Sequence, residues 1–360
     1  MRIGIIGAGQ LGQMLGNAAR ELGFECRFID PSESPPAAST GDVIRTSFDD
    51  TEALAELAAD CDVVTYEFEN VPVDALRAIA SSVPVYPPPA ALAVAQDRLN
   101  EKQLFDELAI ALSGYRAVDS LQDLRQAVSE LGLPVVVKTR RFGYDGKGQT
   151  VIRDLRQVSD AWDELGSQPL IAEAWVAFDY ELSVLGVRST FGDVAIWPLT
   201  RNEHADGILR TSRSPVDNPG LFKRASDYMC RMLEHLDYVG VLALELFVVN
   251  DELLANEFAP RVHNSGHWTI EGADTSQFTN HLLAITGQAP GSTTCPAHAG
   301  MVNLIGQIPD AARDLGDSRI RVHDYGKTPR PGRKLGHITI VAESAKERDD
   351  MLRHIREIVT

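Results

Sequence analysis

The stretch from Leu131 to Ile152, LGLPVVVKTRRFGYDGKGQTVI, predicts two short strands joined by a glycine-rich loop. Three valines, Val135–Val137, lead directly into Lys138. The loop contains three glycines, Gly143, Gly146 and Gly148. Glycine permits φ > 0 and lets backbone N–H groups approach a phosphate. We therefore expect a hairpin whose tip covers a phosphate group. The glycine spacing differs from that of a P-loop and from that of a kinase loop. A plain surface hairpin is the alternative, and Lys138 disfavours it because a charge on a buried strand needs an anionic partner.

The charge balance limits the classes of partner. The chain has 360 residues and a formal net charge of −17, which disfavours nucleic acid or an anionic membrane as a partner. An anionic substrate must therefore be held by local basic clusters. The sequence contains no apolar run of the roughly 18 residues that would span a bilayer and no signal-peptide pattern. Four widely spaced cysteines are typical of buried thiols in a reducing cytoplasm.

The first residues predict a strand, a glycine-rich turn and a helix. Residues 2–7, RIGIIG, predict a buried strand, Gly7–Gly12 has the spacing G-x-G-x-x-G, and Asp30 ends the next strand, as in dinucleotide-binding folds. Physically, the turn indicates an anion at the helix N-terminus. A nicotinamide-dependent dehydrogenase is therefore one interpretation. Glu67 follows a third strand, 62–66, at the edge where such sheets bind ligands.

A pair of carboxylates is predicted farther along the chain. A three-residue loop, 250–252, would join strands 241–249 and 253–258 and bring Glu245 opposite Glu257. Facing carboxylates repel each other unless a cation lies between them, and such oxygen ligands suit Mg²⁺. The alternative is a register slip that turns one glutamate to solvent.

Two groups of donors follow the carboxylates. Arg261, His263 and Asn264 come directly after a strand end and could bind an oxyanion. A basic cluster, 327–334, includes Lys334 and lies near Gly332.

The remaining pattern predicts further helices and strands. We expect helices over 13–22, 91–108, 121–131, 154–165, 221–236 and 347–358, and strands over 24–30, 83–86, 170–173, 180–188, 194–198, 301–305 and 337–342.

Several segments together resemble the ATP-grasp superfamily, and within it the N5-carboxyaminoimidazole ribonucleotide synthases of purine biosynthesis. The segments are GAGQLGQM (7–14), DRLNEKQLFDEL (97–108), VVVKTRRFGYDGKGQ (135–149), ANEFAPRVHNSGHWTIEGA (255–273) and RKLGHITI (333–340). One departure is Val262, where that family usually has proline. Biotin carboxylases and D-alanine ligases carry asparagine at the position of Ala259, so they are less similar.

The resemblance implies an α/β and α+β protein with an ATP-grasp fold. It implies an N-terminal Rossmann-like substrate-binding domain over 1–94, an ATP-grasp domain over 95–298 with a small lid lobe at about 113–176, and a small β-rich C-terminal domain over 299–360. The implied reaction uses ATP and bicarbonate to make carboxyphosphate, which carboxylates 5-aminoimidazole ribonucleotide. The resemblance also implies that the protein is a homodimer, that it uses Mg²⁺, with Mn²⁺ as an alternative, and that a separate mutase takes the product.

The resemblance also implies roles for individual residues. ATP would be bound by Arg98, Lys138, the loop Gly143, Tyr144, Asp145, Gly146, Lys147, Gly148 and Gln149, the adenine hinge Glu173, Ala174, Trp175 and Val176, and by Glu181, His204, Asn256 and Glu257. Glu245 and Glu257 would hold the metal. Asp145, Arg261, His263, Asn264 and Lys334 would be catalytic, with Asp145 a candidate base. The ribonucleotide would contact Gly9, Gln10, Leu11, Glu67, Tyr144 and Lys334, with its phosphate in the turn Gly7–Gly12.

Two other classes of function remain as alternatives. A dehydrogenase would explain residues 1–30 but would leave the glutamate pair and the glycine loop unexplained. A nucleotide-binding regulator without catalysis is disfavoured because both the carboxylates and the basic donors are present. Consumption of ATP that depends on the ribonucleotide and bicarbonate, without NAD binding, would separate the three.

Overall fold

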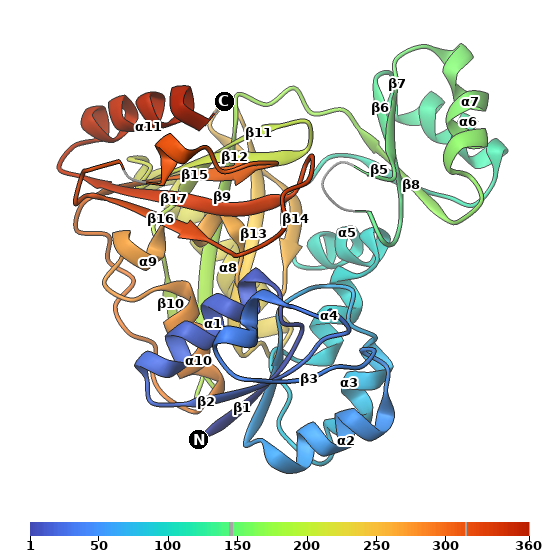
Figure 1. The fold of residues 1–360 in the computed structure, drawn as a ribbon. Helices are drawn as coiled ribbons and strands as arrows, with labels where there is room; N and C mark the ends of the chain where they lie inside the picture. Colours follow the sequence, from blue (N-terminus) through green and yellow to red (C-terminus); the bar gives the residue numbers. More distant parts are fainter. Residues whose placement is uncertain (144–146, 314, 360) are drawn as a thin grey trace.

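The structure, a computed structural model, describes residues 1–143, 147–313 and 315–359. Its strands form a four-stranded N-terminal sheet, a four-stranded sheet in an outlying lobe, and a central nine-stranded sheet. Figure 1 shows the N-terminal unit below the central sheet and the lobe standing to one side. The mixed α/β and α+β architecture confirms the predicted fold class. In the part of the chain that is described, no helix is long and apolar enough to cross a membrane.

The N-terminal sheet is parallel and covered on both faces. Its order is β3 (Asp42–Ile44), β2 (Glu25–Ile29), β1 (Arg2–Ile6) and β4 (Val63–Tyr66), and its helices are α1 (Gln10–Glu21), α2 (Thr51–Asp60) and α3 (Val73–Ile79), with a 3₁₀ turn η1 (Pro36–Ser39). Ile3 and Ile5 are fully buried, as expected for a strand between two helical layers. The predicted strand at 83–86 is wrong, because there only Val85 makes a single bridge to the sheet.

The lobe contains the predicted glycine-loop hairpin. Its sheet has the order β5 (Tyr115–Val118), β8 (Leu170–Ala174), β6 (Val135–Thr139) and β7 (Gln149–Ile152), with α6 (Leu121–Leu131), η2 (Leu155–Gln157) and α7 (Val158–Leu165). Strand alternation buries Val135 and Val137 in the lobe's core and leaves Val136 and Lys138 on the opposite face. That face lines the large cleft described below.

Asp97 divides the helix that the sequence predicts over 91–108. The structure has α4 (Pro89–Ala95) and α5 (Arg98–Glu107), and the Asp97 carboxylate caps α5 by accepting a hydrogen bond from the Leu99 amide at 3.0 Å. The same carboxylate accepts two hydrogen bonds from the Arg140 guanidinium, at 2.9 and 2.7 Å. Arg98 and Lys102 on α5 point inward: Lys102 is buried, and Arg98 pairs with Glu257 of β14 (Glu252–Ala259).

The central sheet runs β14-β13-β9-β11-β12-β15-β17-β16, and β10 pairs with β9. The strands are β9 (Tyr180–Arg188), β10 (Val194–Ile196), β11 (Thr200–Ala205), β12 (Ile208–Ser214), β13 (Gly240–Val249), β14 (Glu252–Ala259), β15 (His298–Ile305), β16 (Ile320–Asp324) and β17 (Lys334–Ala342). The helices around it are α8 (Pro219–His235), α9 (Thr269–Gly272), α10 (Gln277–Ile285) and α11 (Ala345–Val359), with 3₁₀ turns η3 (Asn264–Gly266) and η4 (Asp310–Ala312). Strands β11, β12 and β16 were not predicted. Because β15 pairs with β12, the C-terminal strands extend the central sheet.

The cysteines agree with the prediction only in part. All four are free; Cys26 and Cys61 are buried, whereas Cys230 is exposed and Cys295 is partly exposed.

Candidate active site

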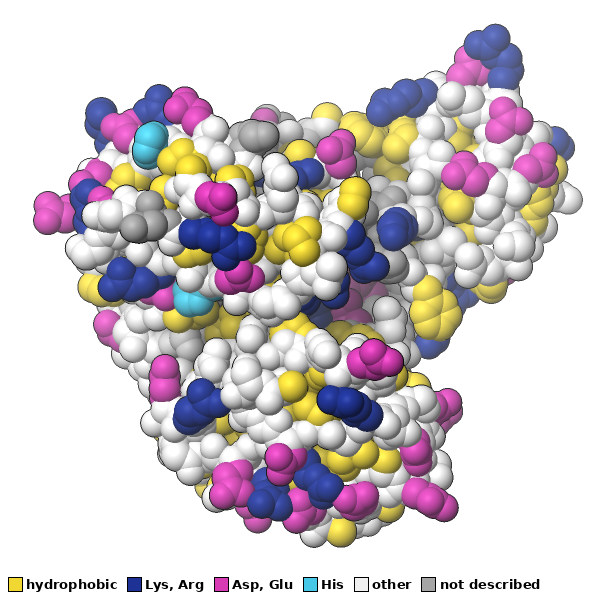
Figure 2. Space-filling view, viewed as in Figure 1, with side chains coloured by type: hydrophobic (Ala, Val, Ile, Leu, Met, Phe, Trp, Pro, Cys, Tyr) yellow, Lys and Arg dark blue, Asp and Glu magenta, His cyan; other side chains and the backbone are white. Residues whose placement is uncertain are grey.

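A cleft of about 530 Å³ lies where the three sheets meet. Figure 2 shows this hollow between the lobe and the body of the molecule, with basic and acidic side chains on its wall. Most predicted site residues line it: Gln10, Leu11, Glu67, Arg98, Lys138, Gly143, Gln149, Trp175, Glu181, His204, Glu245, Asn256, Glu257, Arg261, His263, Asn264 and Lys334. Other predicted residues that the structure describes lie outside the lining: Gly9, Lys147, Gly148, Glu173, Ala174 and Val176. Tyr144, Asp145 and Gly146 lie outside the described residues.

Glu245 and Glu257 face each other across β13 and β14, as predicted, but by a different route. The loop has two residues, Asn250 and Asp251, both with φ > 0, which is the geometry of a tight type I′ hairpin turn. The predicted three-residue loop is therefore wrong. A bulge between Glu245 and Leu246 then shifts the pairing by one residue, leaves Asn256 as the extra residue of β14, and restores the carboxylate pair.

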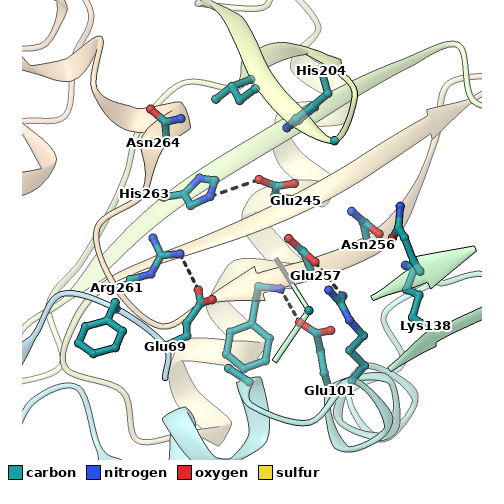
Figure 3. Close-up of a pocket in the computed structure, with 18 of the residues that line it drawn as sticks. Glu69, Glu101, Lys138, His204, Glu245, Asn256, Glu257, Arg261, His263 and Asn264 are labelled. Atoms are coloured by element: carbon teal, nitrogen blue, oxygen red, sulfur yellow. Dashed lines mark hydrogen bonds and ion pairs between the residues drawn. The ribbon is translucent and has the colours of Figure 1, made fainter. Parts of the chain in front are cut away.

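The two carboxylates differ in their surroundings (Figure 3). Burial and the charge of Glu257 raise the pKa of Glu245. Burial opposes ionisation of Glu257 as well, but Arg98, which donates a hydrogen bond to it at 3.0 Å, and Lys138 outweigh that effect and lower its pKa. The pair therefore carries less than its full charge, and a divalent cation would replace the proton. Among the described residues no cluster of three or more His, Cys, Asp or Glu side chains could hold a metal, so these two would need oxygen ligands from elsewhere.

The cationic side of the cleft comes from the lobe and α5. Lys138 pairs with Glu173 at 3.1 Å, and Lys102 lies 3.6 Å from the same Glu173 oxygen. Lys138 therefore has an anionic partner within the protein, so its position alone does not require a phosphate. Burial opposes ionisation of Glu173, but Lys138 and Lys102 lower its pKa to about 2. Its other oxygen is buried and has no partner among the described residues.

Glu181 and His204 form an ion pair next to the carboxylates. The Nδ1 atom of His204 lies 2.7 Å from Oε2 of Glu181. Burial lowers the pKa of His204, but this contact and the nearby charges of Glu245 and Glu257 raise it above its usual value overall. His204 therefore carries positive charge more readily than an exposed histidine.

The predicted adenine hinge lies at the end of β8. The amide of Ala174 donates to the Gly114 carbonyl at 2.8 Å, and that of Trp175 donates to the Pro134 carbonyl at 3.1 Å. These two amides are thus already used by the lobe.

In the loop between β6 and β7, Gly148 has φ +70°, and a Cβ atom there would lie 2.7 Å from Oγ1 of Thr139, so only glycine fits.

A third group lies on the opposite wall of the cleft. Arg261 pairs with Glu69 at 2.7 Å, and Nε2 of His263 lies 3.3 Å from Oε1 of Glu245. Burial, with Arg261 and Lys334 nearby, lowers the pKa of His263 well below its usual value, so the ring is neutral. Both polar atoms of the Asn264 side chain are buried and have no partner among the described residues. An unpaired buried amide on a cleft wall is suited to bind a small polar ligand.

Two amides of the N-terminal glycine turn are already occupied by a side chain. The amides of Gly9 and Gly12 both donate to the Glu67 carboxylate, the second at 2.6 Å. Asp30, the acid of the dinucleotide fingerprint, is buried and accepts a hydrogen bond from the Ala8 amide at 2.9 Å. Asp30 therefore holds the turn and does not face a ribose, which argues against the dehydrogenase interpretation. A phosphate could reach the Gly9 and Gly12 amides only by displacing Glu67, and its predicted position at the turn stays a prediction.

Three residues of the site were not predicted. Lys102 donates to the Asn256 carbonyl, Glu69 pairs with Arg261, and the buried Glu101 accepts a hydrogen bond from the Phe258 amide at 2.7 Å. Burial raises the pKa of Glu101 to about 8. For Glu101 and Lys102 the signal in the sequence was DRLNEK, in which one helical turn carries alternating charges that an exposed helix would show equally well. For Glu69 the signal was its position two residues after Glu67, beyond the end of β4.

Comparisons with known proteins identify the family of this chain. Three family profiles match: a ribonucleotide synthetase preATP-grasp domain over residues 1–96, an ATP-grasp domain over 103–278, and a phosphoribosylaminoimidazole carboxylase C-terminal domain over 299–351. The N5-carboxyaminoimidazole ribonucleotide synthase of Pseudomonas aeruginosa is 47% identical over 340 residues, which cover 94% of each chain.

Solved structures agree over the whole chain. The N5-carboxyaminoimidazole ribonucleotide synthetase of Thermus thermophilus has a TM-score of 0.95 and 47% identity, covering 99% of this chain and 98% of its own. The Aspergillus clavatus synthase, solved with ADP and 5-aminoimidazole ribonucleotide, has a TM-score of 0.91 and 29% identity, covering 99% of this chain and 98% of its own. With this identity over nearly its full length, the chain belongs to the N5-carboxyaminoimidazole ribonucleotide synthase family.

Proposed function

We propose that this chain catalyses the carboxylation of 5-aminoimidazole ribonucleotide to N5-carboxyaminoimidazole ribonucleotide, with ATP and bicarbonate as co-substrates and ADP and phosphate as products. The supporting observation is that one cleft joins a facing carboxylate pair, cations on one side, and on the other a neutral histidine beside an asparagine that has no partner among the described residues. The names of its relatives point to the same reaction, and one relative was solved with ADP and the ribonucleotide.

In the first step bicarbonate attacks the γ-phosphorus of ATP, and ADP leaves. Arg98 and Lys138 would contact the phosphates, and they are held in place by Glu257 and Glu173. Glu245 and Glu257 would hold Mg²⁺, with Mn²⁺ as an alternative, which neutralises the charge of the phosphate oxygens. The raised pKa of Glu245 fits such a site, because two facing carboxylates need a cation between them to ionise fully.

The rest of ATP would extend toward the lobe. The segment Glu173–Val176 would read adenine, Glu181 would accept from the ribose hydroxyls, and His204 and Asn256 would complete the pocket. The loop 143–149 would cover the phosphates. The close contact of His204 with Glu181 keeps both side chains on the cleft wall.

In the second step carboxyphosphate releases phosphate, and its carbon forms a bond with the exocyclic amine of the ribonucleotide, which loses a proton. Arg261, His263, Asn264 and Lys334 would bind bicarbonate and carboxyphosphate. Asn264 offers both an N–H donor and a carbonyl acceptor there. Asp145, as base, and Tyr144, on the substrate side, remain predictions from the sequence.

The ribonucleotide would bind between the N-terminal unit and Lys334. Gln10, Leu11 and Glu67 line this part of the cleft. Because Glu67 already receives the Gly9 and Gly12 amides, we assign it to the substrate's hydroxyl or amine groups, with the substrate phosphate away from those two amides. The enzyme would act in the cytoplasm as a homodimer and pass its product to a separate mutase.

The test measures release of ADP and phosphate by the purified chain. Release that requires ATP, bicarbonate, the ribonucleotide and Mg²⁺ together, with formation of the carboxylated product, is the expected result. Release of phosphate without the ribonucleotide at an equal rate, or binding of NAD, would contradict the assignment.

A further inference from the structure

A chain of buried hydrogen bonds runs beneath the cleft and ends at His263. From the ring outward, Nδ1 of His263 lies 2.8 Å from Oγ of Ser265, which lies 2.8 Å from Oγ of Ser183. Nδ2 of Asn202 lies 3.0 Å from Oγ of Ser183, and Oγ of Ser212 lies 2.8 Å from Oδ1 of Asn202. All four residues beyond His263 are at most 3% exposed. A buried chain of polar groups destabilises the fold unless each donor has an acceptor. The direction in which the hydrogen bonds run along the chain therefore determines which ring nitrogen of His263 carries the proton.

One contact sets the direction. The backbone amide of Ser265 points at Nδ1 of His263 at 3.4 Å, where His263 is the N-cap of η3. An amide can only donate, so Nδ1 must accept, and in a neutral ring the proton then sits on Nε2. The Ser265 hydroxyl can therefore donate to Nδ1 as well.

The remaining members follow in one consistent order. With the Ser265 hydroxyl turned to His263, its oxygen accepts from Ser183. The Ser183 oxygen then accepts from the Asn202 amide group, and the Asn202 carbonyl accepts from Ser212. No donor faces a donor in this order. The reverse order would place a ring N–H against the Ser265 amide.

The backbone of His263 is fixed by a separate contact. Gln277 accepts from the His263 amide at 2.8 Å and donates to its carbonyl at 2.7 Å. The hydrogen-bonded chain thus controls only the ring. Ser183 lies opposite Glu245 in the ladder of β9 and β13, so the chain and the carboxylate pair share one face of the central sheet.

We propose that Ser265, Ser183, Asn202 and Ser212 are positioning residues that hold His263 as its Nε2–H tautomer, so that it donates a hydrogen bond toward Glu245 and the cleft. A donor at this place would stabilise an anionic oxygen of bicarbonate or carboxyphosphate, whereas a lone pair there would repel it. This consequence rests on the proposed function; the tautomer itself does not.

The test reads the ring directly. Nitrogen-15 NMR of histidine-labelled protein, with His263 assigned by comparison with His263→Asn, should show a protonated Nε2 and an unprotonated Nδ1. Asn202→Asp is nearly isosteric but cannot donate to Ser183, so it removes the chain's support while the Ser265 amide still opposes reversal, and the population of the Nε2–H tautomer should fall. Ser183→Ala, two hydrogen bonds from the ring, should lower kcat about tenfold and leave the KM for ATP unchanged.

Ser214→Ala is the matched control. Ser214 is equally buried and lies on β12, but it donates to the Leu199 carbonyl and is not part of the chain. A protonated Nδ1 in the wild-type ring, or a Ser183→Ala variant that matches Ser214→Ala in both spectrum and kcat, would overturn the proposal. Absence of ribonucleotide-dependent activity in the wild-type protein would instead refute the proposed function, because the NMR spectrum of the ring does not depend on turnover.

Discussion

Replacement of Asp97 by alanine should destabilise the protein and weaken its affinity for ATP together. Asp97 caps α5 and receives two hydrogen bonds from Arg140, and its side chain is 9% exposed. Loss of an aspartate N-cap removes about 1 kcal/mol. Breaking a fully buried ion pair costs about 3–5 kcal/mol, but the Arg140 side chain is 21% exposed, so solvent reduces that part to roughly 2 kcal/mol.

The total is about 3 kcal/mol, which corresponds to a fall in Tm of roughly 4 °C for a chain of 360 residues. Because Arg98 begins α5 and its amide donates to the Arg140 carbonyl at 2.9 Å, the KM for ATP should rise severalfold. Thermal unfolding followed by circular dichroism and a coupled ADP-release assay measure the two effects.

Asp154 provides the matched control. It also caps a helical turn, η2, and receives two hydrogen bonds from an arginine, Arg156, but its side chain is 43% exposed and lies away from the cleft. Asp154→Ala should therefore lower Tm much less and leave the KM for ATP unchanged. Equal effects of the two substitutions would show that burial and the link to Arg98 do not matter, and would refute this reasoning.

Three further outcomes are expected. Glu257→Gln should abolish turnover with an unchanged dichroism spectrum, and near-normal ADP release at ordinary Mg²⁺ would contradict the metal assignment. Glu67→Ala, which frees the Gly9 and Gly12 amides, should raise the KM for the ribonucleotide strongly and leave that for ATP unchanged; the reverse pattern in steady-state kinetics would place ATP at the turn. Burial lowers the pKa of His281 to about 3, whereas its value in the unfolded chain is about 6.5. The free energy of unfolding therefore decreases by up to about 1.4 kcal/mol for each pH unit below about 6.5. Urea unfolding of His281→Gln from pH 7 to 5 should show a weaker dependence on pH than the wild type, and equal slopes would count against this linkage.

The sequence by itself determined those helices and strands whose conformation depends on neighbouring residues alone. Val135–Thr139 and Gln149–Ile152 form the predicted hairpin because β-branched residues and glycines restrict the backbone without help from distant residues. The facing of Glu245 and Glu257 was predicted correctly, but from a three-residue loop that shifts the register by the same one residue as the bulge does. The bulge at Asn256 was not predictable, because a two-residue turn with a bulge and a three-residue turn without one give the same register at Glu245 and Glu257.

Only the tertiary structure decided what each charged group contacts. The G-x-G-x-x-G turn and Asp30 match a dinucleotide site in sequence, yet Glu67, 58 residues from Gly9, fills the turn, and Asp30 is buried beneath it. Strands β11 and β12 contain the polar residues Asn202 and Ser212, which are typical of loops in a sequence. In the structure the central sheet buries them and they form a hydrogen bond with each other. The physical reason is the same in each case: a buried polar group is stable only with its partner, and the partner is brought to it by the fold from a distant part of the chain.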